Sequence, residues 1–322
     1  INKFNDSYFY VRKQFLNGFL PGIFLFFLFL RLDYRILKKY SNYIYIAALV
    51  LLGLVFVPGV GATFNKARSW IKVANIFSFQ PSEIAKLALI IFLAAWLEYR
   101  MAGRFSKSQT FVRFLIFLGL LGGLVLLEPD MGTAAIIIFI ATLMYFISGA
   151  PLLYLGGMGI AAAIGSFVLV KLAPYRLARL TVFLNPSADP QGIGYHLNQA
   201  LLAIGSGGIF GVGLGQSLQK FQYLPEVYAD SIFAVVGEEL GFIFCAIFII
   251  AFVSFLIRGF QVALAAPDNF GKFMAVGIVG WIVGQAFLNV AAMLSLAPIT
   301  GVPLPFISYG GTALMTTLAA CG

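Results

Sequence analysis

Nine long apolar runs decide what this chain can fold into. An α-helix needs roughly 20 mainly apolar residues to cross the hydrocarbon core of a bilayer. Only 10% of the 322 residues are charged, against about 25% in a soluble domain, so polar groups cannot cover the surface of this chain. The runs lie at 14–31, 43–59, 83–99, 112–127, 132–149, 152–173, 230–257, 272–296 and 306–322. The sequence therefore predicts an all-α polytopic membrane protein with one integral membrane domain over residues 1–322.

Basic residues in three short connections predict the orientation. The connections after the first, third and seventh runs hold Arg31, Arg35, Lys38 and Lys39, then Arg100, Arg104, Lys107 and Arg113, then Arg258 and Lys272. One crossing per run brings all three to the same side, and Lys and Arg in short loops mark the cytoplasmic side. The long polar segment 174–229 is then an extracytoplasmic loop. Its amphipathic stretch, Tyr195 to Ile204, predicts a structured cap on the membrane.

The composition argues against several kinds of site. The single His196 and the two cysteines, Cys245 and Cys321, give no metal-ligand spacing and no disulfide framework, so we expect no protein-built metal site. The net charge of +9 comes mostly from residues that flank apolar runs. Topology and anionic lipid head groups explain that charge, and we expect no nucleic-acid partner.

Acidic residues in and beside one run are the first functional candidates. Asp230 opens the run 230–257, where it is either a helix N-cap or a carboxylate that faces a substrate at the membrane boundary. The two interpretations are compatible. Glu238 and Glu239 lie deeper in the run, where an unpaired charge is costly. Lys86, within another apolar run, is their expected partner.

The remaining polar segments allow two interpretations each. Gln80 to Glu83 reads as a capped helix start, and Glu128-Pro129-Asp130 as a tight turn between helices. A basic set suggests an anionic ligand such as a diphosphate, or attraction to anionic lipid; it comprises Lys66, Arg68, Lys72, Arg176, Arg179 and Lys220. The glycines of 205–215 lack the context of a nucleotide loop. The prolines and glycines of 301–311 interrupt the membrane pattern, which is tolerated where backbone lines a cavity.

Seven segments, in order and spacing, resemble the SEDS family of FtsW, RodA and SpoVE. The segments are 66–71, 79–83 with Lys86, 128–134, 185–190, 194–199, 223–230 and 303–311. The likeness covers essentially the whole chain and is closer to FtsW than to RodA. It implies ten spanning helices, the first of them absent here, so that the chain is expected to be a fragment of a longer protein.

The resemblance implies a peptidoglycan glycosyltransferase. Such enzymes polymerise lipid II on the outer face of the bacterial cytoplasmic membrane, in division or elongation, with a class B penicillin-binding protein and other divisome or elongasome membrane proteins. Asp230 matches the family's catalytic Asp. The usual Pro-Glu-x-His-Thr-Asp-Phe reads Pro-Glu-Val-Tyr-Ala-Asp-Ser at 225–231, so any role of that His does not carry over. The matched motifs imply substrate binding by Lys66, Arg68, Trp70, Ser82, Glu83, Lys86, His196, Gln199, Lys220, Glu226, Ser308 and Tyr309.

The expected reaction is inverting glycosyl transfer, with Asp230 as the base. The undecaprenyl diphosphate leaving group needs a Mg or Mn ion, whose site the sequence does not indicate, or basic residues. Two alternatives remain open. A lipid II flippase or transporter would use Glu238, Glu239 and Lys86 along a translocation path, and a noncatalytic division scaffold would need none of them.

Overall fold

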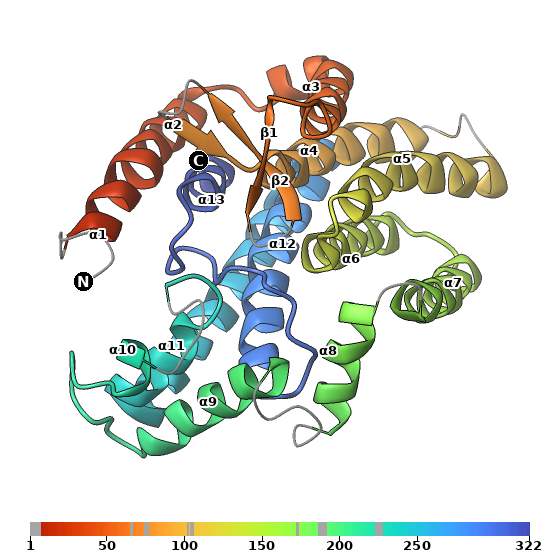
Figure 1. Ribbon diagram of the computed structural model, residues 1–322. Coiled ribbons are helices and arrows are strands. Elements are labelled where there is room, and N and C mark those ends of the chain that lie inside the picture. Colours follow the sequence, from red (N-terminus) through yellow and green to blue (C-terminus); the bar gives the residue numbers. More distant parts are fainter. Residues whose placement is uncertain are drawn as a thin grey trace. The chain divides into compact units, whose positions relative to one another are not determined.

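The computed structural model describes residues 8–64, 67–73, 77–101, 103, 106–171, 174–185, 192–222 and 228–322. Helices dominate this part of the chain, and the predicted all-α class is confirmed (Figure 1). The first helices are α1 (Phe9–Gln14), the π-helix η1 (Phe15–Phe19), α2 (Leu20–Arg31), α3 (Arg35–Leu54), α4 (Pro81–Met101), α5 (Lys107–Leu127) and α6 (Met131–Ile147). The others are α7 (Leu152–Lys171), α8 (Pro174–Leu184), α9 (Ile193–Ser206), α10 (Gln219–Gln222), α11 (Ile232–Ala265), α12 (Asn269–Met293) and α13 (Gly311–Cys321).

Each of the nine predicted runs overlaps a helix or a continuous helical series. Within the described residues, four segments are long and apolar enough to cross a membrane: Phe9–Arg31, Lys107–Leu127, Ile232–Ala265 and Asn269–Met293. Shorter apolar helices lie at Met131–Ile147, Leu152–Val168 and Gly311–Cys321. The predicted cap stretch within 174–229 is helical, as α9. The chain is therefore a multi-pass membrane protein.

The polar segment between α3 and α4 forms a small antiparallel sheet that the helix-based prediction did not include. Its strands are β1 (Gly61–Phe64), β2 (Ala67–Val73) and β3 (Phe77–Phe79), in the order β1-β2-β3. Ile71 pairs with Gly61 on one side and with Phe79 on the other. The sheet leads directly into α4.

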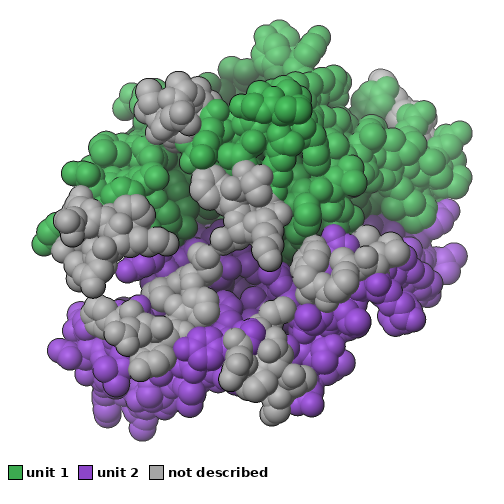
Figure 2. Space-filling view, in the orientation of Figure 1, with its two compact units in different colours: residues 1–151, 256–284, 309–322 green, residues 152–255, 285–308 purple. Residues whose placement is uncertain are grey.

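The chain divides into two compact units, which are coloured separately in Figure 2. Unit 1 comprises residues 1–151, 256–284 and 309–322, and unit 2 comprises residues 152–255 and 285–308. Helices α11 and α12 each contribute residues to both units.

The core of unit 1 forms where α3 packs on α4 and α13 packs on α2 (Figure 1). At one end of unit 1 the basic connections meet. Tyr34 Oη donates a hydrogen bond of 3.0 Å to Asp268, and Arg35 lies 3.6 Å from the same carboxylate. Lys38 forms an ion pair with Glu98 near the end of α4. These contacts place the connections that follow α2 and α11 at the same end, as predicted.

Helix α11 of unit 2 is interrupted, whereas the apolar run predicted one continuous helix. Gly241 has φ 74° and ψ −173°, a conformation that suits glycine. The break frees backbone groups, and the glycine-rich segment before α10 binds them: Phe242 N–H donates to Gly208 O, and Val212 N–H donates to Glu238 O. A broken helix at membrane depth needs such partners. The glycines of 205–215 therefore serve close backbone pairing with α11.

Candidate functional site

Asp230 lies in a turn, residues 228–231, immediately before α11. The helix begins at Ile232, two residues later than the predicted run. The Asp230 side chain is half-buried. A Cβ atom on Gly301 would lie 3.3 Å from Asp230 Oδ2, and Gly301 has φ +73°. A glycine at position 301 therefore leaves room for the carboxylate.

Two buried side chains hold the backbone of this turn. Asn289 Nδ2 donates hydrogen bonds to the carbonyl oxygens of Asp230, at 2.9 Å, and Val302, at 2.8 Å. The Ser308 hydroxyl donates to Ala229 O and accepts from Leu304 N–H. The interrupted segment 301–308 and α12 thus fix the position of Asp230 in unit 2.

The predicted residues His196 and Gln199 lie one turn apart on α9, and both are half-buried. His196 Nε2 is 2.6 Å from the hydroxyl of Ser231, which is fully buried. Helix α9 therefore contacts the residue that directly follows Asp230.

Lys220, Glu238 and Glu239 form an ionic cluster between α10 and the first part of α11. Lys220 pairs with Glu239. Glu238, only 3% exposed, accepts hydrogen bonds from the Ser217 hydroxyl and from Leu218 N–H. Both acids thus have partners inside unit 2.

The predicted pairing of Lys86 with Glu238 or Glu239 is wrong. Lys86, which is fully buried, lies 2.8 Å from Glu83 Oε1, one turn earlier on α4, and 4.9 Å from the ring centroid of Trp281. Residues three apart on a helix share a face, so Glu83 is the local partner. The second carboxylate oxygen of Glu83 and the hydroxyl of Ser82 are buried and accept or donate no hydrogen bond within the described residues.

The turn between α5 and α6 carries a buried acid. Glu128 is fully buried, and neither of its carboxylate oxygens has a hydrogen-bond partner among the described residues. Burial, and then the charge of Asp130, raises the pKa of Glu128 to about 8. Asp130 caps α6 by accepting from Thr133, and the Gln80 amide contacts it at 3.4 Å. The start of α4 and the start of α6 therefore meet in unit 1.

The other predicted site residues are dispersed. Arg68 donates to Val57 O at 2.7 Å, half-buried Trp70 lies on β2, and Tyr309 packs edge-to-face on Tyr10. All three belong to unit 1, like Ser82, Glu83 and Lys86. Lys66 and Glu226 lie outside the described residues.

The described residues contain no protein site for the expected Mg or Mn ion. Among them, no three His, Cys, Asp or Glu side chains form a group that could hold a metal ion. A divalent cation remains an expectation that follows from the diphosphate chemistry.

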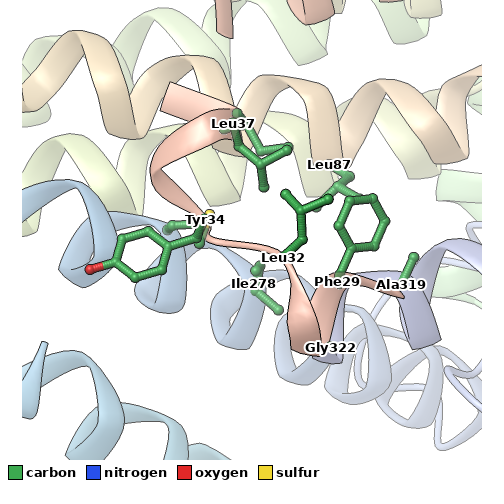
Figure 3. A pocket seen from close by; sticks show the side chains of 11 residues that line it. Phe29, Leu32, Tyr34, Leu37, Leu87, Ile278, Ala319 and Gly322 are labelled. Atoms are coloured by element: carbon green, nitrogen blue, oxygen red, sulfur yellow. The ribbon is translucent and has the colours of Figure 1, made fainter. Parts of the chain in front are cut away.

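Two cavities lie near the basic end of unit 1, and both lack predicted site residues. One is apolar and about 70 Å³ in volume (Figure 3), and Phe29, Leu32, Leu37, Leu87 and Ile278 are among its lining residues. The other, about 550 Å³, is lined by Lys38, Ser41, Asn42, Ala95, Trp96, Glu98 and Tyr99. The candidate chemistry lies elsewhere, around Asp230 and around Glu83 and Lys86.

Sequence reasoning missed Asn289 and Gln285. Both are 2% exposed, and Gln285 Nε2 donates to Pro303 O at 2.8 Å. Their signal was available, because two amides four residues apart inside an apolar run occupy one helix face and need partners.

Comparison with known proteins finds sequence similarity over the whole chain. The family model FtsW/RodA/SpoVE, described as cell cycle protein, matches residues 1–322. Stage V sporulation protein E of Bacillus subtilis (strain 168) is 42% identical, over 99% of this chain and 87% of the relative. A probable peptidoglycan glycosyltransferase FtsW of Geobacter sp. (strain M18) is 39% identical, with the same coverage of both chains.

Solved structures are also similar to this chain over nearly its whole length. A chain from a study of how a peptidoglycan synthase complex coordinates polymerization and crosslinking matches with a TM-score of 0.80 and 30% identity, over 98% of this chain and 88% of that one. A mutant of the rod shape determining protein RodA of Thermus thermophilus matches with a TM-score of 0.72 and 30% identity, over 98% and 86%. On its full length and its fold, the chain belongs to the FtsW/RodA/SpoVE family.

Proposed function

We propose that this chain is a peptidoglycan glycosyltransferase that polymerises lipid II on the outer face of the bacterial cytoplasmic membrane. The observation that carries this proposal is the Asp230 carboxylate, which lies against Gly301 in a turn that Asn289 and Ser308 anchor. It is supported by whole-length similarity to relatives named peptidoglycan glycosyltransferase. The same similarity to FtsW and to the sporulation protein supports a role in division or in a related wall-building process.

In the proposed reaction, Asp230 acts as general base. Its carboxylate takes the proton from the acceptor 4-hydroxyl while that oxygen attacks the anomeric carbon of the donor sugar. A new glycosidic C–O bond forms, and the bond from the anomeric carbon to the diphosphate breaks with inversion. The proton ends on Asp230, and undecaprenyl diphosphate leaves with the bonding electron pair. Because the backbone of Asp230 is anchored, the base is oriented before substrate arrives.

Each unit contains polar groups whose chemistry suits substrate binding. In unit 2, half-buried Gln199 on α9 belongs to the same unit as Asp230. In unit 1, Ser82 Oγ and Glu83 Oε2 are buried oxygen atoms that have no hydrogen-bond partner among the described residues, and Lys86 pairs with the other carboxylate oxygen of Glu83. These groups suit the sugar hydroxyls and phosphates of a lipid-linked disaccharide. Lys220 is bound to Glu239, so its charge is largely neutralised by that residue.

A class B penicillin-binding protein is the proposed partner. The similar chain in a peptidoglycan synthase complex supports a partner that crosslinks the glycan. Other divisome or elongasome membrane proteins are further proposed partners of the same assembly.

The test is polymerisation of labelled lipid II by purified protein with its partner. We expect Asp230→Asn to abolish glycan synthesis while the folded protein remains in the membrane fraction, because the amide keeps the shape of the side chain and cannot take a proton. Glycan synthesis by this variant at the wild-type rate would refute the assignment of the base.

Lipid II transport is the second candidate. The break in α11 at Gly241 and the buried Lys86–Glu83 pair are features that transporters also use. Translocation of labelled lipid II in proteoliposomes separates the two functions. Translocation that persists in Asp230→Asn, with no polymerisation by the wild type, would favour transport.

A further inference from the structure

We propose that Asn289 is a positioning residue for Asp230, acting together with Ser308 and His196. This inference rests on the proposed function, since it concerns the geometry of the proposed base. It assigns Ser308 and His196, which the family motifs suggested for substrate binding, to the support of the turn.

Three consecutive residues of the turn are each bound by a different element. Ser308, from the segment that follows α12, donates to the carbonyl of Ala229. Asn289, on α12, donates to the carbonyl of Asp230. His196, on α9, binds the hydroxyl of Ser231. The turn is thereby held immediately before, at and immediately after Asp230.

The chemistry of Asn289 suits this role specifically. Both atoms that face its Nδ2 are carbonyl oxygens, of Asp230 and Val302, so a side-chain NH₂ group is required. An aspartate would bring an acceptor against two acceptors. The side chain is 2% exposed, so water cannot readily replace the lost donor. Asn289 thus joins the turn 228–231 to the segment 301–308.

Residues 228–231 form a turn before the first residue of α11, and Ser231 O accepts hydrogen bonds from the N–H groups of Ala234 and Val235 at the helix start. The three side-chain bonds add to this anchoring at Ala229, Asp230 and Ser231. A displacement of about 1 Å in a reacting group is enough to lower a rate roughly 100-fold. Loss of the Asn289 bond should accordingly slow the chemical step and leave substrate affinity unchanged.

Gln285 provides a matched control on the same helix. It lies one turn before Asn289, it is equally buried, and its Nε2 donates to Pro303 O at 2.8 Å. Its bond to Pro303 O holds the segment 301–308. Asn289→Ala and Gln285→Ala both remove a buried amide donor, but the first releases the carbonyl oxygens of Asp230 and Val302, whereas the second releases that of Pro303.

The experiment measures kcat and KM for lipid II polymerisation by full-length protein with its partner. We expect Asn289→Ala to lower kcat by roughly 10- to 100-fold with KM within about twofold of wild type. Gln285→Ala should keep kcat within a few-fold, and the thermal unfolding midpoint of both variants shows that each is folded under the assay conditions.

The outcomes separate this inference from the proposed function. Equal kcat losses in Asn289→Ala and Gln285→Ala would overturn the positioning role, as would a raised KM with kcat unchanged. Wild-type activity of Asp230→Asn would instead overturn the proposed base. If Asn289→Ala does not fold, Ser308→Ala gives the same test, because it releases the Ala229 carbonyl while Asn289 still joins α12 to Val302.

Discussion

Glu128 shows how a single buried side chain makes stability depend on pH. Its carboxyl group is fully buried, and burial together with the charge of Asp130 raises its pKa to about 8. In the unfolded chain the pKa of this group is near 4.5, the ordinary value of a glutamic acid side chain. The fold therefore favours the protonated acid. The resulting stability is fully present below about pH 4.5 and is lost as the pH rises through about 8.

We predict that Glu128→Gln removes this dependence. The amide is uncharged at every pH, whereas the wild-type group loses up to about 1.4 kcal/mol of stability per pH unit within the window. The measurement is the thermal unfolding midpoint in detergent from pH 5 to pH 8.5. The unfolding midpoint of Glu128→Gln should rise relative to that of the wild type toward high pH. The control variant Asp33→Asn, at an exposed position, should show the wild-type dependence on pH. Parallel profiles for wild type and Glu128→Gln would show that Glu128 is not the titrating group.

A second residue-scale prediction concerns the buried pair Glu83–Lys86. Removal of one partner strands the other charge, so Glu83→Gln and Lys86→Met should each cost about 3–5 kcal/mol. The double variant should cost less than the sum of the two. Unfolding free energies in a double-mutant cycle provide the measurement. The partly exposed pair Lys38–Glu98 is the control, with an expected coupling below about 1 kcal/mol. Additive losses for Glu83 and Lys86 would contradict a coupled pair.

At the scale of elements, the break in α11 depends on glycine. A Cβ atom on Gly241 would lie 2.3 Å from the backbone nitrogen of Gly211, and the positive φ adds strain for any other residue. We predict that Gly241→Ala destabilises unit 2 by at least about 1–3 kcal/mol. Gly156→Ala on α7 is the matched control: its Cβ would meet no atom within 4 Å, and helix propensity predicts a gain of up to about 1 kcal/mol. The measurement is the thermal unfolding midpoint of both variants. Equal changes in midpoint would contradict the inference that the backbone conformation at position 241 requires glycine.

The helices were largely predictable, and their interruptions were not. Apolar length alone located α5 and α12, because a membrane span needs little beyond continuous hydrophobicity. The break at Gly241 lies inside such a run and leaves the hydropathy unchanged, so hydropathy does not predict it. The strands β1 to β3 are short, and their pairing depends on contacts between them.

The sequence predicted individual residues of the site, but it did not predict which side chains and backbone groups they contact. The motif resemblance located Asp230, His196 and Ser308, which share unit 2. The partner of Lys86 was predicted wrongly. The sequence shows that Glu83 lies three residues away, but it does not show which of the acids Glu83, Glu238 and Glu239 lies nearest to Lys86 in the fold. The spacing of Gln285 and Asn289 indicated buried amides that need partners, but the two carbonyl oxygens that Asn289 binds are known only from the fold.

At the scale of the whole molecule, the distribution of charge makes a topology prediction. In unit 1, the contacts of Tyr34 and Arg35 with Asp268, and of Lys38 with Glu98, gather the basic connections at one end. Short loops rich in Lys and Arg remain in the cytoplasm. The connection between α4 and α5 belongs to this group through its own basic residues, while α8 and α9 belong to the segment predicted to lie outside.

Single cysteines at Ser108 and Leu184 test this orientation. Both native side chains are exposed, on α5 and at the end of α8, so a thiol at either position can react. Cys245 and Cys321 are first replaced by alanine to remove background labelling. We predict that an impermeant maleimide labels position 184 in intact cells and labels position 108 only after the membrane is permeabilised. The reverse pattern would invert the model and would place Asp230 in the cytoplasm, where no glycan is polymerised. The same labelling result thus decides whether the proposed base faces the compartment in which its substrate is consumed.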